Sequence, residues 1–456
     1  MPIRELPYQR DVCQLFAPFA RARHAVLLDS GKPRQQQGRY DIFSAWPIAQ
    51  LNINNNGIHY KDSDKNDHSL HDLHQLKQYL TQNRSAHKAT LQSTAQDTQL
   101  PFCGGWLGFA SYELGYLLEN AAGKSTQLPK LPLFHAGYYN WAVIQDHQQQ
   151  CAYLVYHDDI APELLARIEQ TLAGAADETS GHFHLLEPFR PGPDLSDYRH
   201  AFRRIEEYIA NGDCYQVNYA MPFYARFAGD CFSAYRKLRE AVPSPYMAYI
   251  QHGQQQLLSI SPERFIAADG SRIHSKPIKG TVARSIDPAE DRQQAQSLLA
   301  SDKNRAENVM IVDLIRNDFS RHSQANSVKV DKLCELESFA NVHHLVSTVS
   351  ATLDASSTIW DVFFDSFPGG SITGAPKIRA QQIINELEKV NREIYCGSIF
   401  MASDNGHFDS SICIRTLHSR QHTLTAWAGG GIVADSTLED EYQECINKIS
   451  ALLAAL

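Results

Sequence analysis

A predicted β-hairpin in the middle of the chain constrains the fold more than any other feature of this sequence. Residues 264–268 and 271–275 pair naturally as two strands, because the Asp269-Gly270 pair between them favours a two-residue hairpin turn. Residues 257–261 have the composition of the strand that leads into this hairpin. The segment therefore predicts antiparallel sheet structure at this point of the chain.

The residues just after the hairpin are expected to leave the regular strand. Pro277 has no backbone N–H to donate to a sheet, and Gly280 tolerates unusual backbone angles, so we expect a break or a bulge here. Glu263 before the hairpin and Lys279 after it then lie together at the open end. A carboxylic acid beside a lysine amine is an arrangement that covalent catalysis uses. Taken alone, the segment around Lys279 is more simply explained as a surface lysine after a strand.

The sequence around these two residues resembles a known enzyme family. Glu263 lies in Ser-Pro-Glu-Arg-Phe, and Lys279 lies in Pro-Ile-Lys-Gly-Thr. Both segments resemble those of the chorismate-utilising enzymes, which include the anthranilate, isochorismate, salicylate and aminodeoxychorismate synthases. Further matches extend to the C-terminus, so the resemblance covers most of the chain. Anthranilate synthases typically carry alanine at the position of Lys279, so the lysine favours the aminodeoxychorismate branch.

The composition restricts the class of partner. The formal net charge of −9 and the absence of any run of lysines and arginines argue against nucleic-acid binding. No apolar run approaches ~20 residues, and the N-terminus lacks the hydrophobic region of a signal peptide, so we expect no membrane association and a cytoplasmic location. The nine cysteines include no C-x-x-C pair, which indicates neither a zinc site nor a disulfide framework.

The resemblance implies one large α+β body, built of two facing antiparallel β-sheets with helices on the outside. Residues 1–190 are expected to complete the second sheet and a tryptophan pocket, and residues 195–456 to form the chorismate-binding catalytic region. Residues 174–194 are rich in glycine and proline and are the only plausible linker between these halves.

Two segments resemble the tryptophan-contacting residues of anthranilate synthases. Ser244 stands next to the second segment, where that family usually has asparagine. In the aminodeoxychorismate branch such a pocket can hold tryptophan as a structural ligand, so binding and feedback inhibition are separate questions. The expected tryptophan-binding residues are Leu28, Asp29, Ser30, Pro245, Tyr246 and Met247.

The last helix carries acidic residues that its own structure does not fully explain. Ser436 and Glu439 predict a capping box at its start. Glu441 and Glu444 are three residues apart, so they share one face of the helix and have no evident structural role. An ordinary explanation for Glu444 is an ion pair with Lys448 one turn later.

The resemblance implies a magnesium ion held by glutamates. Glu307 lies in a predicted helix, where a charged side chain on a solvated face is the ordinary interpretation. In the family, however, Mg²⁺ is held at positions that match Glu307, Glu441 and Glu444. Carboxylate and water oxygens are the ligands that Mg²⁺ prefers. Asn304 replaces an acidic residue common three positions before Glu307, which puts any supporting role of that position in doubt.

Two glycine-rich segments are candidate anion sites. Residues 368–377 are expected to open a helix with Pro376 in its first turn, but they lack the Gly-Lys-Ser/Thr of a phosphate-binding P-loop. Residues 428–433 have an ordinary explanation as a tight turn between strands. The family implies the following substrate-binding residues: Gln216, Thr281, His344, Ser371, Tyr395, Arg415, Gly429, Gly430, Gly431 and Lys448.

The resemblance implies amination of chorismate at C4, without pyruvate elimination, a reaction that serves 4-aminobenzoate and folate biosynthesis. Lys279 would attack C2 while Glu263 protonates the departing C4 hydroxyl. No cysteine lies on the glycine-rich elbow that a glutaminase needs, so ammonia is expected from a separate glutamine amidotransferase subunit.

Three alternatives remain at this stage. Anthranilate synthase is disfavoured by Lys279. Isochorismate-type enzymes place a water-activating lysine where this chain has Gln216, which cannot act as a base. A catalytically silent tryptophan-binding subunit is disfavoured by the retention of the lysine, the acid and the three glutamates.

Overall fold

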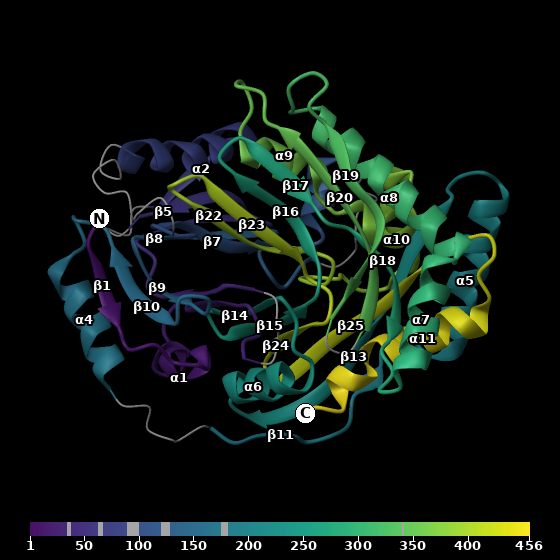
Figure 1. The fold of residues 1–456 in the computed structure, drawn as a ribbon, viewed down its shortest axis with the longest axis horizontal. Helices are drawn as coiled ribbons and strands as arrows, with labels where there is room; N and C mark the ends of the chain where they lie inside the picture. The colour runs from purple at the N-terminus through teal and green to yellow at the C-terminus, as the bar shows by residue number, and fades with distance from the viewer. Residues whose placement is uncertain (34–37, 63–66, 89–99, 120–127, 175–180, 340–341) are drawn as a thin grey trace.

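The chain folds around two large antiparallel sheets that face each other, with helices on the outside (Figure 1). This arrangement confirms the expected α+β fold class. The computed structural model describes residues 1–33, 38–62, 67–88, 100–119, 128–174, 181–339 and 342–456.

Within these ranges, thirteen strands form the first sheet, which occupies the lower part of Figure 1. Their spatial order is β1 (Ile3–Leu6), β10 (Cys151–Tyr156), β9 (Trp141–Asp146), β3 (Tyr40–Ser44), β2 (Val26–Asp29), β14 (Tyr246–His252), β15 (Gln255–Ser261), β24 (Thr416–Arg420), β25 (Thr423–Ile432), β13 (Gln216–Gly229) and β11 (Phe183–Leu185). Two short strands, β12 (Arg190–Pro191) and β21 (Gly374–Ala375), also pair with β13.

Twelve strands of the described residues form the second sheet. Their spatial order is β18 (Ile278–Ala283), β20 (Val342–Thr352), β17 (Arg272–Ser275), β16 (Arg264–Asp269), β23 (His407–Ile412), β22 (Ser398–Ser403), β7 (Gly105–Ala110), β8 (Phe134–Tyr139), β4 (Ala49–Asn54), β5 (Gly57–Lys61) and β6 (Asp67–Leu70), with β19 (Lys329–Ser338) paired to β20. The first 160 residues therefore contribute strands to both sheets.

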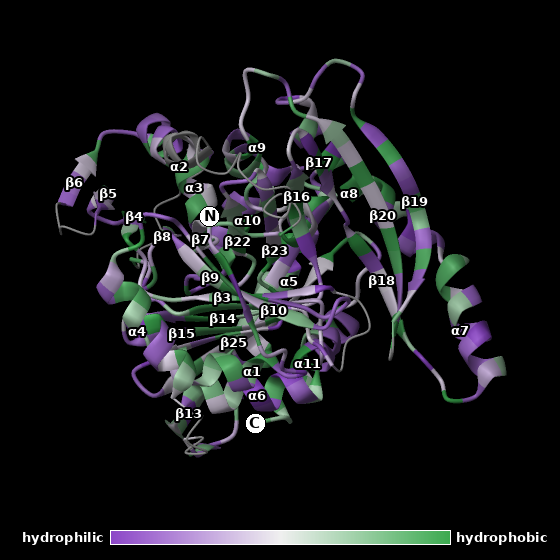
Figure 2. Cartoon of the chain, turned by 60° about the vertical axis from the view of Figure 1, so that its left-hand side comes forward, coloured by the Kyte–Doolittle hydropathy of each residue, from purple (hydrophilic) through white to green (hydrophobic). Residues whose placement is uncertain are grey.

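Helices cover the outer faces of the sheets. Among them, α6 packs on β15, α8 on β20 and α11 on β25. Figure 2 shows apolar residues along the central strands β14, β15 and β25, and polar residues along the outer β19 and α7.

The helices of the described residues are α1 (Val12–Phe16), α2 (Leu73–Lys88), α3 (Leu114–Leu118), α4 (Pro162–Ala173), α5 (Leu195–Ala210), α6 (Cys231–Ala241), α7 (Pro288–Leu299), α8 (Asp302–Ser320), α9 (Ile359–Ser366), α10 (Lys377–Leu387) and α11 (Leu438–Leu453), with the 3-10 turns η1 (Ala17–Phe19) and η4 (Gly370–Ile372).

The central hairpin predicted from the sequence is present as β16 and β17. Its register pairs Asp269 with Arg272, so the two turn residues are Gly270 and Ser271, one position later than predicted. Gly270 has a φ of 60°, which a residue without a side chain adopts at low cost.

The predicted break after the hairpin is also present. The pairing of β18 with β20 shifts register between Ile278 and Thr281, and Gly280 within this bulge has a φ of 83°. Lys279 therefore lies inside the bulge, as expected.

The expected linker is partly wrong. Residues 175–180 lie outside the described residues, but β11 and β12 pair with the long strand β13 and so extend the first sheet. Proline and glycine in this segment fit short edge strands, which need few backbone donors. The boundary between residues 190 and 195 stays a prediction.

Two of the points at which the chain crosses between the sheets lie side by side. Residues 262–263 connect β15 to β16, and residues 413–415 connect β23 to β24. Backbone hydrogen bonds join the crossings, because Ile412 N donates to Glu263 O and Ile260 N donates to Arg415 O, each at 3.0 Å. The two crossings fix the backbone of Glu263 and Arg415 between the sheets.

An aromatic cluster packs α9 against the second sheet. Trp360 and Phe363 of α9 contact Phe400 of β22 and Phe408 of β23, with ring centroids 5.3 to 5.7 Å apart. Burial of such rings supplies most of the stabilisation of a core. None of the described helices is both long and apolar enough to cross a membrane.

Candidate active site

Glu263 lies at the first sheet crossing and is almost fully buried, with 6% of its surface exposed. Its carboxylate accepts a hydrogen bond from the Ser371 hydroxyl, with 3.3 Å between Oγ and Oε1. Burial raises the pKa of Glu263 to about 7, although the nearby Lys279 and the Ser371 hydrogen bond oppose this rise. A carboxyl group with this pKa is partly protonated near neutral pH, as a general acid requires.

Lys279 is held close to this acid by the bulge in β18. Its amine donates a hydrogen bond to the backbone carbonyl of Ser371, with 3.2 Å between Nζ and O. Desolvation lowers the pKa of Lys279, and the carboxylates of Glu307 and Glu263 limit the shift. Ser371 thus binds the acid with its hydroxyl and the amine with its carbonyl.

The turn η4 places Ser371 because glycine allows it to approach α8. A Cβ atom on Gly370 would lie 1.8 Å from Cδ2 of Leu314, so a side chain here would displace either Leu314 or the turn. The following helix α10 begins at Lys377, with Pro376 as its N-cap rather than in its first turn as predicted. The Lys377 amine donates to Asp318 and to the Ser366 carbonyl, each at 3.0 Å, so it supports the loop from inside.

His344 and Arg415 form a second polar group between the sheets. Thr281 pairs with His344 across β18 and β20, and the Thr281 hydroxyl lies 2.8 Å from Nδ1 of His344. Burial, with a smaller effect of the charged Arg415, lowers the pKa of His344 to about 4. His344 is therefore neutral near pH 7 and offers hydrogen bonds rather than charge.

Gln216 and the glycines of β25 approach each other closely. Gln216 is 1% exposed, and neither Oε1 nor Nε2 of its amide has a hydrogen-bond partner within the described part of the chain. A Cβ on Gly431 would lie 2.5 Å from this Nε2, and a Cβ on Gly430 would lie 2.6 Å from Oε2 of Glu441. The glycines therefore make room for the side chains of Gln216 and Glu441. The sequence suggested a tight turn at these glycines, but they lie within the strand β25.

Lys448 and Tyr395 lie against the same strand. The Lys448 amine donates to the carbonyl of Gly429 at 3.1 Å. The ring of Tyr395 stacks on Trp427 of β25, with centroids 5.7 Å apart and planes 9° from parallel. These two residues, Gln216 and the three glycines thus gather along β25.

The three candidate metal ligands come from α8 and α11. Glu444 forms an ion pair with Lys448, with 2.5 Å between the charged atoms, which is the ordinary arrangement considered from the sequence. Glu441 accepts from the Ser436 hydroxyl at 2.7 Å. The expected capping box is wrong, because α11 begins one residue later, with Thr437 as its N-cap.

The negative charges of Glu307 and Glu444 act on the pKa of Lys279. Glu307 and Glu444 both raise the pKa of Lys279, and Glu444 also raises that of Glu441. The oxygens of the three glutamates do not all lie within 4.8 Å of one another, since among the described residues only three histidines bring three possible ligand atoms that close together.

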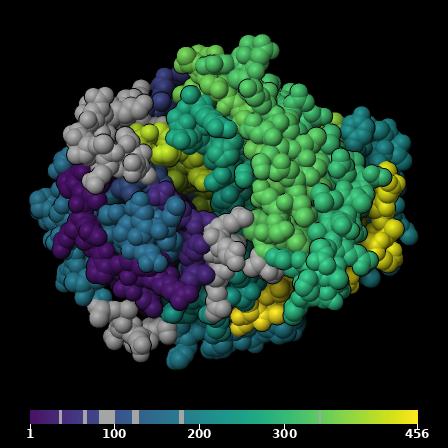
Figure 3. All heavy atoms as spheres, viewed as in Figure 1, coloured from purple at the N-terminus to yellow at the C-terminus, as the bar shows by residue number. Residues whose placement is uncertain are grey.

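A separate cavity of about 360 Å³ lies between the sheets, and we call it the N-terminal cavity because Leu28, Asp29 and Ser30 of β2 and its following turn line it. Figure 3 shows a hollow on this face, with residues near 400 at its floor between N-terminal and central segments. All six predicted tryptophan-binding residues line the cavity, as do Arg264 and segments of β22 and β23. The β22 and β23 segments were not predicted, because they lie more than 150 positions after Met247 in the sequence.

Two of these six side chains already have protein partners. The Asp29 carboxylate pairs with Arg239, with 2.5 Å between Oδ2 and Nε, and accepts from the Tyr235 hydroxyl at 2.8 Å. The Ser30 hydroxyl donates to Asp41 at 2.7 Å. Both residues therefore shape the cavity wall more than they offer free hydrogen-bonding groups.

Comparison with known proteins identifies the family. A family model described as chorismate binding enzyme matches residues 23–454. The chain belongs to the chorismate-binding enzymes. It is 40% identical to aminodeoxychorismate synthase component 1 of Escherichia coli over 99% of this chain and 97% of that protein. It is 32% identical to the Bacillus subtilis protein of the same name, over 99% and 96%.

The fold agrees with this assignment to the chorismate-binding enzymes. The crystal structure of anthranilate synthase component I from Streptococcus pneumoniae matches with a TM-score of 0.77 and 29% identity, covering 91% of this chain and 92% of that one.

Proposed function

We propose that this chorismate-binding enzyme aminates chorismate at C4 to give 4-amino-4-deoxychorismate, a step toward 4-aminobenzoate and folate. The curated relatives with the name aminodeoxychorismate synthase component 1 support this activity. The observation that carries the mechanism is that one residue, Ser371, binds both the Lys279 amine and the Glu263 carboxyl.

The reaction proceeds by two displacements. The Lys279 amine adds to C2 of chorismate, the two ring double bonds shift, and the C4 hydroxyl leaves as water with a proton from Glu263. Ammonia then adds at C4, the double bonds shift back, and the C2–nitrogen bond to Lys279 breaks. Covalent catalysis of this kind replaces one difficult step by two easier ones.

The environment of both groups suits these roles. A lysine nucleophile must be neutral, and desolvation lowers the pKa of Lys279 toward that state. The acid must hold its proton near neutral pH, and burial raises the pKa of Glu263 to about 7. The buried, unpartnered amide of Gln216 is suited to bind substrate, but it is not a base, so it does not support hydration of chorismate.

The donor set of the three glutamates fits Mg²⁺. Burial raises the pKa of Glu441, and the neighbouring carboxylate of Glu444 adds to this rise, so a cation would relieve an unfavourable pair of carboxylates. Glu307, Glu441 and Glu444 would hold the ion, and oxygen ligands of this type are those that Mg²⁺ prefers. When bound, Mg²⁺ supplies positive charge for a carboxylate of the substrate.

The ammonia is expected from a partner subunit. The description "component 1" of the relatives implies an enzyme of more than one part. The nine cysteines are distributed through the fold, eight of them buried, and desolvation raises the pKa of Cys13, Cys396 and Cys413, so these three are poor glutaminase nucleophiles. A glutamine amidotransferase subunit would supply the ammonia.

The N-terminal cavity is suited to tryptophan. It is lined by apolar side chains such as Leu28, Met247 and Met401, together with charged Arg264 and Asp409. An aromatic amino acid needs apolar area for its ring and polar groups for its two charges.

The test is to incubate the purified protein with chorismate, Mg²⁺ and ammonium, and to identify the product by mass. We expect 4-amino-4-deoxychorismate, with chorismate consumed only when ammonium is present. Formation of anthranilate would favour the anthranilate synthase alternative, and isochorismate would show hydration. No turnover of chorismate under any condition would favour the catalytically silent tryptophan-binding subunit.

A further inference from the structure

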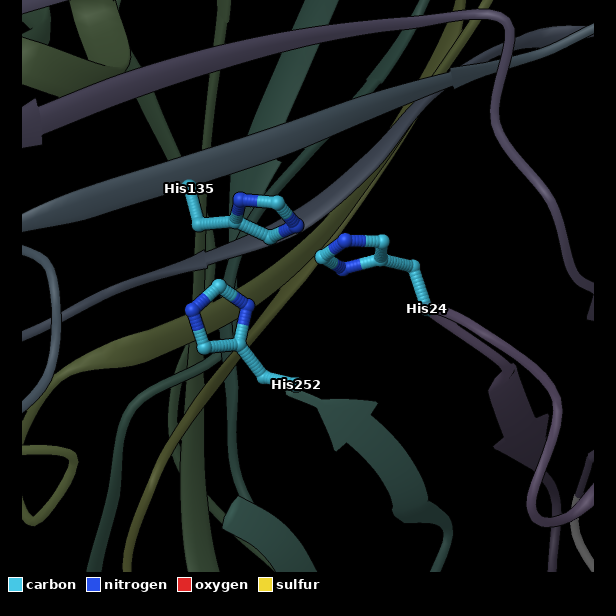
Figure 4. A group of neighbouring side chains, drawn as sticks. All are labelled: His24, His135 and His252. Carbon is cyan, nitrogen blue, oxygen red and sulfur yellow. The ribbon is translucent and has the colours of Figure 1, made fainter. Parts of the chain in front are cut away.

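Three histidines from both sheets meet at a point that the proposed reaction does not use. His24 precedes β2, His252 ends β14, and His135 lies in β8 of the opposite sheet. One possible ligand atom of each lies within 4.8 Å of the others, which makes this the one such group of three in the described residues. Figure 4 shows the three imidazoles gathered around a common space.

The three rings lie against one another, and Phe109 packs against those of His135 and His252. The ring centroids of His24 and His135 are 5.0 Å apart, and those of His135 and His252 are 4.5 Å apart. Within the described residues, Nδ1 of His24 and Nδ1 of His252 are buried and have no hydrogen-bond partner. Buried polar atoms are nearly always paired, so two orphaned nitrogens in one cluster indicate a missing partner.

His135 also makes the hydrogen bond that a metal-binding histidine usually makes with the ring nitrogen that does not bind the metal. Nδ1 of His135 lies 2.8 Å from Oδ1 of Asn52. An amide oxygen only accepts hydrogen bonds, so Nδ1 carries the proton and Nε2 keeps its lone pair. A carbonyl or carboxylate partner of this type fixes the ring and its tautomer in metal sites.

All three imidazoles are held in the state that binds metal. Burial lowers the pKa of His24 to about 3 and that of His252 to about 4, and it also lowers the pKa of His135. Each ring is therefore neutral near pH 7, and each keeps one nitrogen lone pair.

We propose that His24, His135 and His252 form a binding site for a divalent transition-metal ion, with Zn²⁺ as the best fit. Neutral imidazoles without any carboxylate select zinc-like ions over Mg²⁺ and Ca²⁺, which prefer oxygen. Three histidines and one solvent molecule complete a tetrahedral zinc site. His24 and His252 are only partly buried, so an ion and a water molecule can reach the cluster.

The ion would link the two sheets. β2 and β14 are hydrogen-bonded neighbours in the first sheet, and β8 belongs to the second. Zinc–nitrogen bonds of about 2.0 to 2.1 Å place ligand nitrogens roughly 3.3 Å apart, so small rotations of the rings close the site. An ion that binds only the folded chain raises its thermal stability by mass action.

The experiment uses the full-length chain without an affinity tag, stripped of metal by a chelator and dialysed against Zn²⁺. We expect one tightly held zinc per chain by elemental analysis, and a higher melting temperature than in the stripped protein. Loading with Co²⁺ gives a visible absorption spectrum that reports the coordination of the ion.

The variants separate this site from adventitious binding. His252→Asn and His24→Asn should each lose the bound zinc, the cobalt spectrum and the shift in melting temperature. The control is His200→Asn, because His200 is exposed on α5 and outside the cluster; it should keep all three. His135 is 2% exposed, so His135→Asn is interpreted only if it folds. Less than half an equivalent of zinc in the unaltered protein, or equal binding in His252→Asn and His200→Asn, would overturn the proposal.

Discussion

The amine of Lys279 donates to the backbone carbonyl of Ser371 at 3.2 Å, and this contact positions the proposed nucleophile. The Ser371 hydroxyl also donates to the Glu263 carboxylate at 3.3 Å, so this one residue of η4 contacts both the acid and the amine. A positioned pair of this kind lowers the entropic cost of bringing the reacting groups together.

Glu263→Gln should remove the alkaline limb of the pH profile. In the unaltered enzyme, kcat/KM with chorismate at constant free ammonia should fall as the pH rises through about 7, because Glu263 loses the proton that it delivers. Glutamine has no such proton, so the variant should be slow at every pH and lack this limb. A variant with unchanged activity would contradict the assignment of Glu263 as the acid.

The same substitution should alter how stability depends on pH. The pKa of Glu263 is about 7 in the folded protein and near 4.5 in the unfolded chain, so the folded state binds more protons between these values. The contribution of Glu263 to the free energy of unfolding is therefore largest below pH 4.5 and falls as the pH rises toward 7. Urea unfolding should show this fall in the unaltered protein but not in Glu263→Gln, so the difference between the two pH profiles should isolate it.

Gly430→Ala should weaken the response to magnesium. The new Cβ would lie 2.6 Å from Oε2 of Glu441 and would push that carboxylate from its place. We expect the Mg²⁺ concentration for half-maximal activity to rise about tenfold or more, by analogy with disturbed metal ligands. Gly174→Ala is the matched control, since the contacts of its Cβ are ordinary. An identical Mg²⁺ dependence in both variants would remove Glu441 from the metal site.

The N-terminal cavity predicts bound tryptophan. Denaturation of the purified protein should release tryptophan that was not part of the chain, and calorimetry on stripped protein should show binding of tryptophan but not of alanine. Met401→Trp should fill the cavity from β22 and abolish this binding, while amination of chorismate continues. Absence of both release and binding in the unaltered protein would refute a tryptophan site.

Arg239→Met should destabilise the protein strongly. It removes the partner of the buried Asp29 and leaves that carboxylate without a counter-charge, which typically costs about 3 to 5 kcal/mol. The control is Arg21→Met, whose exposed ion pair with Asp230 should contribute less than about 1 kcal/mol. The measurement is the free energy of unfolding in urea, and equal losses in the two variants would contradict this account.

The sequence predicted the local geometry around Lys279 well, because Pro277 and Gly280 restrict the backbone whatever the surroundings. It also predicted the family and the six residues that share one cavity, through motifs shared with relatives. The hairpin turn was misplaced by one residue, since Asp269-Gly270 and Gly270-Ser271 are both acceptable turn pairs and the wider sheet decides between them.

Other features depend on contacts between distant segments, for which the sequence has no signal. The pairing of β11 and β12 with β13 was missed because glycine and proline indicated a linker. The role of Ser371 as the common partner of acid and amine depends on the approach of η4 to α8. The histidine cluster was missed altogether, because its members are more than 100 positions apart and none lies in a recognisable metal motif.

The product formed by Lys279→Ala tests the central claim most directly. Lys276→Ala is the control, since Lys276 lies three residues away and forms only a surface ion pair with Glu337. With chorismate, Mg²⁺ and ammonium, we expect Lys276→Ala to form 4-amino-4-deoxychorismate normally. Lys279→Ala should fold but lose most of this product, and any remaining amination should occur at C2, where ammonia can then attack directly. The usual product at an undiminished rate in Lys279→Ala would contradict the covalent mechanism.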